Sequence, residues 1–297
     1  MPVTLPGLSS SSYQQFISAV IGMALQIPAT YNFFVTPLDL MNFGSDTYRH
    51  LWRTLIEDAV VVAELADVPD GSYGDQQAEI SVQTIGRSAL VSWEVQNSGT
   101  IAPNELARAV LQVVGALRRK IDDLLWTDTA PGLTNEFGSD VTPMSYAQHV
   151  AFMLELDSQT EQEAPMGSVM RAALAKSVWR ALVDDMITQE ANIFAATFGS
   201  MDAQAAVVDS LGRINKRVAG VDIFVTDRVA TVGAGRGNTY AYVGPEDGSA
   251  FGLAVKWGIN AEVRDTESKL ANRVVGSARI GPGILRQDFA IEAQTAA

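Results

Sequence analysis

The sequence contains no cysteine, and this absence excludes disulfide bonds, thiolate nucleophiles and cysteine–zinc sites. Histidine is almost as scarce. His50 and His149 are the two present, and neither stands in a ligand spacing such as His-x-x-x-His. We therefore expect no metal site, no cofactor site and no catalytic residue built on histidine or cysteine.

Long hydrophobic runs are also missing. No apolar run reaches the roughly 18 residues that a membrane helix needs. The most apolar early stretch, residues 16–27, is interrupted by Ser18, Gly22 and Gln26, and no basic segment precedes it. We expect that the protein does not associate with a membrane and that it is made in the cytoplasm.

Positive charge is in short supply, with 21 basic residues against 34 acidic ones and a net charge of −13. A protein that reads nucleic acid normally has a basic surface, so this role is disfavoured, whereas proximity to DNA inside a container is not. The first hundred residues contain three bases, Arg49, Arg53 and Arg87, and ten acids. An arginine side chain can donate two hydrogen bonds to one carboxylate. These three arginines could therefore pair with acids of a neighbouring subunit, or they could lie on a solvated acidic surface.

The first 45 residues have the composition of an arm that lies on a surface. Four prolines and the serine run at residues 9–12 interrupt any regular element. The later part is nevertheless too apolar for a free tail, since it includes Phe33 and Phe34. The surface could be the chain's own body or a neighbouring subunit, and an ordinary N-terminal strand is the alternative.

A hairpin is predicted next. Residues 47–65 could form a short helix, and the dense turn signals of residues 67–75, which include Tyr73, follow. From residue 78 apolar and polar residues alternate, with Ile80, Val82 and Thr84 on one face. We expect residues 60–66 and 78–85 to pair as a long hairpin around the turn, and residues 89–95 to form a further strand.

The clearest helix spans residues 103–126. It begins with Pro103 and an early Glu105, which suit a helix N-terminus. Apolar residues then recur every three or four positions and form one stripe: Leu106, Val110, Val113, Val114, Leu117, Ile121, Leu124 and Leu125. This helix is the longest element that the sequence predicts.

The rest of the chain changes from helical to strand-like patterns. Residues 145–156 and 166–186 are candidate helices. The strands predicted after them are residues 221–226, 239–243, 251–255, 259–264, 273–280 and 284–291. The order gives an α+β chain without the strand–helix alternation of a doubly wound sheet.

No motif in the chain predicts an enzyme. The glycines at residues 233–238 lack the third glycine of a dinucleotide fingerprint, and a strand pattern follows where a helix is needed. We interpret this segment as a loop between strands. The acidic pairs Asp122–Asp123 and Asp184–Asp185 lie on predicted helices, where adjacent side chains diverge by about 100°.

The element order and several segments resemble the HK97-fold major capsid proteins of tailed bacteriophages. The segment IGRSALVSWEV at residues 85–95 looks like the strand that enters the spine helix of that family. The segment GVDIFVTD at 220–227 resembles the strand that these proteins often show before a glycine-rich loop. Three later segments look like the closing strands of the family: SAFGLA at 249–254, NAEVR at 260–264 and RQDFAI at 286–291. The resemblance spans nearly the whole chain.

The resemblance implies a division of the chain into five parts. These are an N-terminal arm (residues 1–45), a hairpin called the E-loop with its flanks (46–95), the spine helix of the peripheral domain (96–130), a mainly axial domain (131–243), and peripheral return strands with the C-terminal strand (244–297). The tip of the E-loop would lie at residues 70–74.

The resemblance implies a structural protein rather than an enzyme. It would assemble with itself into hexamers and pentamers of an icosahedral shell around double-stranded DNA, in a virion made in the host cytoplasm. Some relatives cross-link through an E-loop lysine, but no lysine precedes Lys120, so a non-covalent shell is expected. The expected partners are a separate scaffolding protein, the portal, a candidate decoration protein and DNA bound without sequence specificity. No propeptide is expected to be removed.

The candidate residues for contacts between subunits lie in the arm and around the hairpin. They are Phe33, Phe34, Arg49, Trp52, Arg53, Tyr73 and Arg87. Two other functions stay open. One is an encapsulin-like nanocompartment shell, and the other is a soluble domain that binds a phosphate ligand through the loop at residues 233–238.

Overall fold

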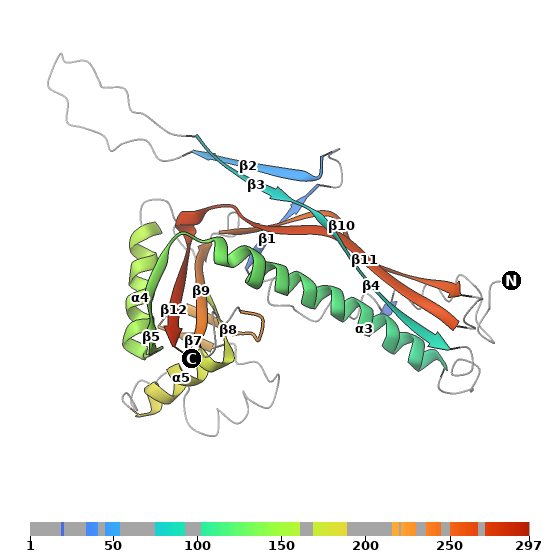
Figure 1. Cartoon of the computed structure of the whole chain (residues 1–297). Coiled ribbons are helices and arrows are strands. Elements are labelled where there is room, and N and C mark those ends of the chain that lie inside the picture. The colour runs from blue at the N-terminus through green and yellow to red at the C-terminus, as the bar shows by residue number, and fades with distance from the viewer. Residues whose placement is uncertain are drawn as a thin grey trace, which may run out of the picture.

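The computed structural model has three β-sheets, which form an elongated part, a compact part and a projecting hairpin (Figure 1). It describes residues 19–20, 34–40, 45–53, 75–92, 102–160, 169–188, 216–219, 221–229, 236–244, 250–266 and 271–296. The mixture of helices and separate, mostly antiparallel strands confirms the α+β class.

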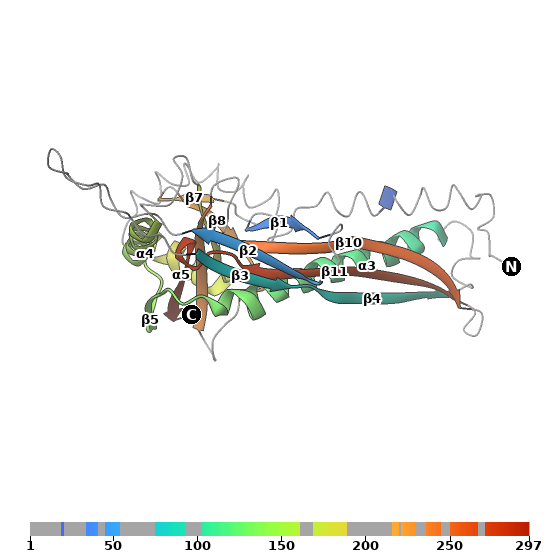
Figure 2. The ribbon, with the colours of Figure 1, turned by 90° about the horizontal axis from the view of Figure 1, so that it is seen from above.

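The elongated part is a four-stranded sheet with one long helix against it. The strands, in spatial order, are β1 (Val35–Asp39), β10 (Phe251–Thr266), β11 (Ala271–Ile284) and β4 (Gln83–Ser92). Strand β1 is parallel to β10, and the other neighbours are antiparallel. Figure 2 shows β10, β11 and β4 running side by side toward the same end, with helix α3 (Ala102–Asp123) along them.

Helix α3 confirms the helix predicted at residues 103–126 and its apolar stripe. Leu106, Val110 and Leu117 are all buried, and Val113 packs so closely on β11 that a methyl group added at Gly276 would overlap it. Beyond Asp123 the helix continues as one wider, π-helical turn, Leu124–Thr129. The helix therefore covers the sheet through the face that its sequence periodicity predicts.

The compact part is a six-stranded mixed sheet. Its strands, in spatial order, are β5 (Glu136–Pro143), β12 (Ala290–Ala296), β9 (Arg236–Gly244), β6 (Val169–Leu174), β8 (Val221–Val225) and β7 (Lys216–Val218). Helices α4 (Tyr146–Thr160) and α5 (Lys176–Thr188) pack beside it. Ser145 and Gln148 form a reciprocal capping box at the start of α4. Asp185 of α5 also accepts a hydrogen bond from the Tyr146 N–H at 2.8 Å.

An aromatic cluster joins the two parts. Phe34, directly before β1, meets Trp126 edge-to-face with ring centroids 4.9 Å apart, and meets Phe224 of β8 at 5.4 Å. Trp126 also lies 6.3 Å from Phe251 at the start of β10. Edge-to-face pairs of this kind stabilise beyond the area they bury. The cluster therefore fixes the end of α3 and both sheets to one another.

The hairpin is a separate two-stranded sheet of β2 (Thr47–Arg53) and β3 (Asp75–Ser81). Strand β3 continues into β4 after a break at Val82 (Figure 2). The predicted alternation is present, because Ile80 and Val82 are buried whereas Ser81 and Gln83 are exposed. After the break the buried position is Ile85 rather than Thr84.

Two of the expected helices are wrong in part. Residues 47–53 form β2, because each of them pairs with a residue of β3, and this pairing overrides the weak helical pattern. The expected partner strand, residues 60–66, lies outside the described residues. The helix expected at 166–186 is strand β6 followed by α5. Its Met, Ala and Leu residues favour a helix, but β6 is an inner strand between β8 and β9, and tertiary packing decides.

The closing strands also differ from the expectation. The strands predicted at 251–255 and 259–264 are one strand, β10, with register shifts on both sides of Trp257. Residues 284–291 do not form a single strand, since β11 ends at Ile284 and β12 begins at Ala290. Strand β12 joins the compact sheet between β5 and β9, whereas β10 and β11 belong to the elongated sheet.

Candidate functional site

The hairpin β2–β3 is the smallest of the described sheets, with two strands. A two-stranded ribbon is marginally stable in water without further packing. Leu51, in the middle of β2, has 69% of its surface exposed. The cross-strand pair Arg49–Glu79 is wide at 3.5 Å and exposed on both sides, so it contributes little. The ribbon therefore depends on contacts at its base and on whatever covers its face.

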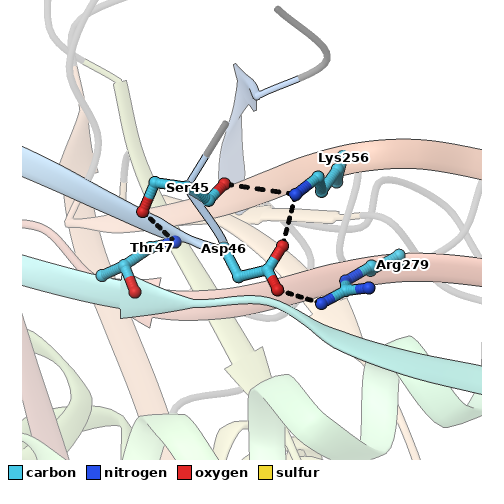
Figure 3. A network of polar contacts seen from close by, with 5 residues as sticks. All are labelled: Ser45, Asp46, Thr47, Lys256 and Arg279. Carbon is cyan, nitrogen blue, oxygen red and sulfur yellow. Dashed lines mark hydrogen bonds and ion pairs between the residues drawn. The ribbon is translucent and has the colours of Figure 1, made fainter. Parts of the chain in front are cut away.

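Asp46 anchors the base of the hairpin (Figure 3). Its backbone carbonyl accepts a hydrogen bond from the Val82 N–H at 2.9 Å, which ties the start of β2 to the end of β3. Its carboxylate forms ion pairs with Lys256 of β10 and Arg279 of β11. The hydrogen bond from Lys256, together with the charges of both bases, lowers the pKa of Asp46. One ionised side chain thus links the hairpin to two strands of the elongated sheet.

Two neighbours hold this anchor in place. The Arg279 guanidinium lies over the ring of Trp257, 5.4 Å from its centroid, at the point where β10 changes register. Gly281 lies directly against the backbone of Ser81, and an added Cβ would overlap the Ser81 carbonyl oxygen. The base of the hairpin therefore packs on β11 without room for a side chain.

A groove with basic walls lies between α3 and β4. It has a volume of about 880 Å³. Its lining comprises Ile85, Gly86, Arg87, Ser88, Ala89, Gln112, Val113, Ala116, Leu117, Arg119, Lys120, Asp123 and Arg228. Asp123 pairs with Arg228 at 2.8 Å, so the other three bases give the groove a positive charge in an acidic chain.

The structure separates the residues predicted for contacts between subunits. Arg49 lies on the exposed hairpin and Arg87 in the groove, while Trp52 and Arg53 lie on β2 opposite Gln76 and Asp75. Phe33 and Tyr73 lie outside the described residues. Phe34 requires a correction, because it is completely buried among the aromatic residues of its own subunit and offers no surface to another.

Sequence reasoning missed the groove as a site. Arg119 and Lys120 fall outside the apolar stripe of the predicted helix, and no sequence pattern points to Arg228. The signal was weak, because the four bases come from three segments that only the packing of α3 on β4 brings together.

The polar residues that could suggest chemistry have structural positions instead. His149 is fully buried, and burial lowers its pKa to about 4. The carboxylates of Asp123 and Asp185 hold Arg228 and the start of α4. The described ranges contain no group of three or more histidine and carboxylate side chains able to hold a metal ion. Of the glycine segment, Arg236 to Asn238 belong to strand β9.

No helix in the described part of the chain combines the length and the apolar character that a membrane span requires.

Comparisons with known proteins show one fold. No family model and no curated protein matches the sequence. Among solved structures, the capsid of Ralstonia phage GP4 matches with a TM-score of 0.63 at 10% identity, over 89% of this chain and 87% of the other. The capsid of cyanophage Pam1 matches at 0.62 and 14%, over 89% and 88%. The virus-like particle from Pyrococcus furiosus matches at 0.51 and 9%, over 95% and 99%. The chain has the HK97-like fold of phage capsid subunits.

Proposed function

We propose that the chain is a major capsid protein whose copies assemble into a closed shell. The observation that carries this proposal is the likeness to phage capsid subunits over about nine tenths of the chain. A shell subunit must present surfaces that stay unsatisfied until copies meet. The two-stranded hairpin with its exposed Leu51 meets this requirement, and rings of identical subunits satisfy such surfaces by closure.

The shell is built from hexamers and pentamers and encloses double-stranded DNA. An acidic subunit makes few attractive contacts with phosphate, so packaged DNA remains free to move along the wall. The first 119 residues contain no lysine, and the hairpin therefore has no amine for an isopeptide bond. The shell is held non-covalently in the virion, after synthesis in the host cytoplasm. Its partners are a scaffolding protein, the portal and a decoration protein.

Within this proposal the hairpin and the arm make the contacts between subunits. Arg49, Trp52, Arg53 and Tyr73 belong to the hairpin segment, and Phe33 belongs to the arm. Arg87 lies in the basic groove. Because arginine pairs with two carboxylate oxygens at once, the three arginines are suited to recognise acidic groups of a neighbour.

The test is assembly of the purified chain, expressed alone and with the genes next to its own. Size-exclusion chromatography and negative-stain electron microscopy should reveal shells, tubes or rings of five and six copies. Leu51→Asp should prevent assembly and leave the subunit folded, because Leu51 contacts little within its own chain. The control is Leu154→Asp on α4, which changes an equally exposed leucine away from the hairpin. A stable monomer under every condition would overturn the proposal.

A nanocompartment shell that holds proteins is the second candidate. The likeness to the Pyrococcus furiosus virus-like particle spans 95% of this chain and is the observation for which this second candidate is retained. Particles produced with the neighbouring genes separate the two functions. A phage capsid should protect DNA from nuclease, whereas a nanocompartment should contain a co-purifying protein and no DNA.

A further inference from the structure

The acid in the lining of the basic groove does not balance its positive charge. Asp123 is already paired with Arg228 at 2.8 Å. Arg87, Arg119 and Lys120 are exposed, and no carboxylate in the described part of the chain pairs with them. Three positive charges around one concave surface repel one another, and an anion in the groove relieves this repulsion. The groove is thus suited to an anionic ligand.

The accessible part of the lining restricts the kind of anion. The large aliphatic side chains of the lining are all buried: Ile85, Val113 and Leu117. Besides the three bases, a ligand meets neutral hydrogen-bonding groups, the amide of Gln112 and the hydroxyl of Ser88. Basic and neutral polar side chains of this kind are the groups that contact nucleic acid phosphates. The lining includes no aromatic side chain on which an unpaired base could stack, so the backbone of a duplex fits better than a single strand.

The two faces of the elongated sheet carry different elements (Figure 1). Successive residues of a strand point to opposite faces. On β11, Gly276 lies against Val113 of α3, whereas Gly281, five residues later, lies against Ser81 of β3. Helix α3 and the base of the hairpin therefore cover opposite faces. Arg87 pairs in register with Gly276, which places it on the α3 face.

The spare positive charge is concentrated on the α3 face. On the hairpin face, Lys256 and Arg279 share Asp46, and Arg273 donates a hydrogen bond to the neutral Ser88 at 3.0 Å. A shell has one wall toward its contents and one toward solvent. Because packaged DNA is a dense array of phosphates, the face with several unneutralised bases is the one suited to meet it.

We propose that Arg87, Arg119 and Lys120 bind the sugar-phosphate backbone of duplex DNA and that the α3 face of the subunit is the inner wall of the shell. The inference rests on the capsid function and names the surface that touches the contents. In a chain with a net charge of −13, three such bases make a contact that is weak, independent of sequence and sensitive to salt. DNA held in this way can still slide during packaging. For Arg87, a phosphate takes the place of a neighbour's carboxylate.

A binding experiment on the full-length chain tests these three residues. The probe is a short fluorescent DNA duplex, titrated at low salt and followed by anisotropy. Each base that contacts a phosphate adds about one to the salt dependence, so the logarithm of the affinity should fall with the logarithm of the salt concentration with a slope of about −3. The triple variant Arg87→Gln, Arg119→Gln, Lys120→Gln should bring this slope to about zero and weaken binding by about tenfold or more at low salt. Its melting temperature should not change, because the three side chains are exposed.

A matched control removes the same amount of charge outside the groove. It is the triple variant Lys176→Gln, Arg180→Gln, Arg264→Gln, in which all three side chains are largely exposed. It should bind the duplex as the native chain does. Equal weakening by both triple variants would mean that only the net charge matters, and this outcome would overturn the proposal.

Formaldehyde cross-linking of DNA-filled particles tests the orientation of the subunit. Formaldehyde joins lysine amines to DNA bases that lie beside them, and Lys120 is the lysine of the groove. The variant Arg273→Lys places a second exposed lysine on the opposite face of the same sheet. Mass spectrometry of these particles should find nucleotide adducts at position 120 and not at position 273. Adducts at position 273 without adducts at position 120 would place the α3 face outside and overturn the proposal.

The remaining outcomes separate this proposal from the capsid function. Particles that protect DNA but give no adduct at Lys120 would refute the DNA contact and leave the capsid function standing. Duplex binding through the three bases by a chain that forms no particles would refute the capsid function instead. An acidic peptide that binds through these bases when the duplex does not would assign the groove to a protein. If Arg87→Gln prevents assembly and leaves duplex binding unchanged, Arg87 belongs to the contacts between subunits, and the three-residue site is wrong.

Discussion

His149 lies on α4 in the core of the compact part and is shielded from solvent. Its side chain is completely buried, and burial lowers its pKa to about 4, an effect that the nearby Val218 backbone offsets only in part. The ring is therefore neutral in the folded chain over most of the acid range. In the unfolded chain the same ring takes up a proton near pH 6.5. Protonation consequently favours the unfolded state.

The stability of the compact part should fall in acid because of this residue. Between about pH 6.5 and pH 4 the unfolded chain binds more protons than the folded one, so the free energy of unfolding decreases as the pH falls. A shift of this size corresponds to up to about 3 kcal/mol. His149→Leu keeps an apolar side chain there and should flatten the pH dependence, as measured by urea unfolding from pH 7 to pH 4. The control is His50→Gln in the hairpin, which should change the curve less, and parallel curves for His149→Leu and the native chain would contradict the prediction.

Gly281 allows two backbones to touch. It lies on β11 where the end of β3 crosses, and a methyl group would overlap the Ser81 carbonyl oxygen and approach the Val82 Cα. Because the obstacles are backbone atoms, they cannot move aside as a flexible side chain could. Gly281→Ala should therefore reduce the free energy of unfolding by at least about 1–3 kcal/mol.

A second glycine provides the matched control for this substitution. Gly258 also lies in a strand of the elongated sheet, but a Cβ added there would meet nothing within 4 Å. Gly258→Ala should leave thermal stability almost unchanged, whereas Gly281→Ala should lower the melting temperature clearly. Similar melting temperatures for the two variants would show that the hairpin base is not tightly packed on β11.

At the scale of the element, the hairpin is held to the elongated sheet at its base, and Asp46 makes the polar contacts there. Its own strands are joined to each other along seven residue pairs, but Asp46 links them to β10 and β11 through its carboxylate. The pKa of this carboxyl is lowered by the hydrogen bond from Lys256, so it remains charged at neutral pH. The carboxylate therefore acts beside the apolar contacts of Ile80 and Val82 in holding the base of the hairpin on the elongated sheet.

Asp46→Asn should loosen the hairpin and leave the body unchanged. The amide keeps the size of the side chain and the backbone bond to Val82, but it removes both ion pairs. Hydrogen exchange of the amides in β2 and β3 should become faster, while exchange in α3 should not change. Glu79→Gln, which removes only the wide pair with Arg49, is the control and should have a smaller effect. Unchanged exchange in β2 and β3 would show that the carboxylate does not anchor them.

The elements that the sequence predicts well are those whose burial follows one local period. Helix α3 has a single apolar stripe and was predicted correctly, and the alternation of the strand at residue 78 was predicted correctly as far as Val82. Strand β6 was predicted as a helix because its residues favour helices, and its place between β8 and β9 depends on partners far along the chain. The groove could not be predicted for the same reason, since Arg87 and Arg228 are separated by nearly half of the chain and only the fold brings both to α3.

At the scale of the whole molecule, acidic and basic side chains are concentrated in different parts of the chain. Residues 54–74 contain five acids and no lysine or arginine, whereas the groove between α3 and β4 has four bases and one acid in its lining. The aromatic cluster around Trp126 packs the two sheets and the end of α3 into one body. Copies arranged in a ring can place acid against base at every contact, and the charge that keeps single subunits apart then orients them.

Shells of this protein should come apart into single chains when denatured. The hairpin segment contains no lysine, so a neighbour's side chain finds no amine there to form an isopeptide bond. Lys256 lies near the hairpin base, but its ammonium group is paired with Asp46. Purified particles boiled in detergent should give one band near 31.8 kDa on a denaturing gel, however long they have been stored. Raising the salt should weaken the intact particles, since the exposed ion pairs that join subunits are screened. A ladder of bands at multiples of the chain mass would contradict a non-covalent shell, and mass spectrometry of the ladder would locate the residues that are joined.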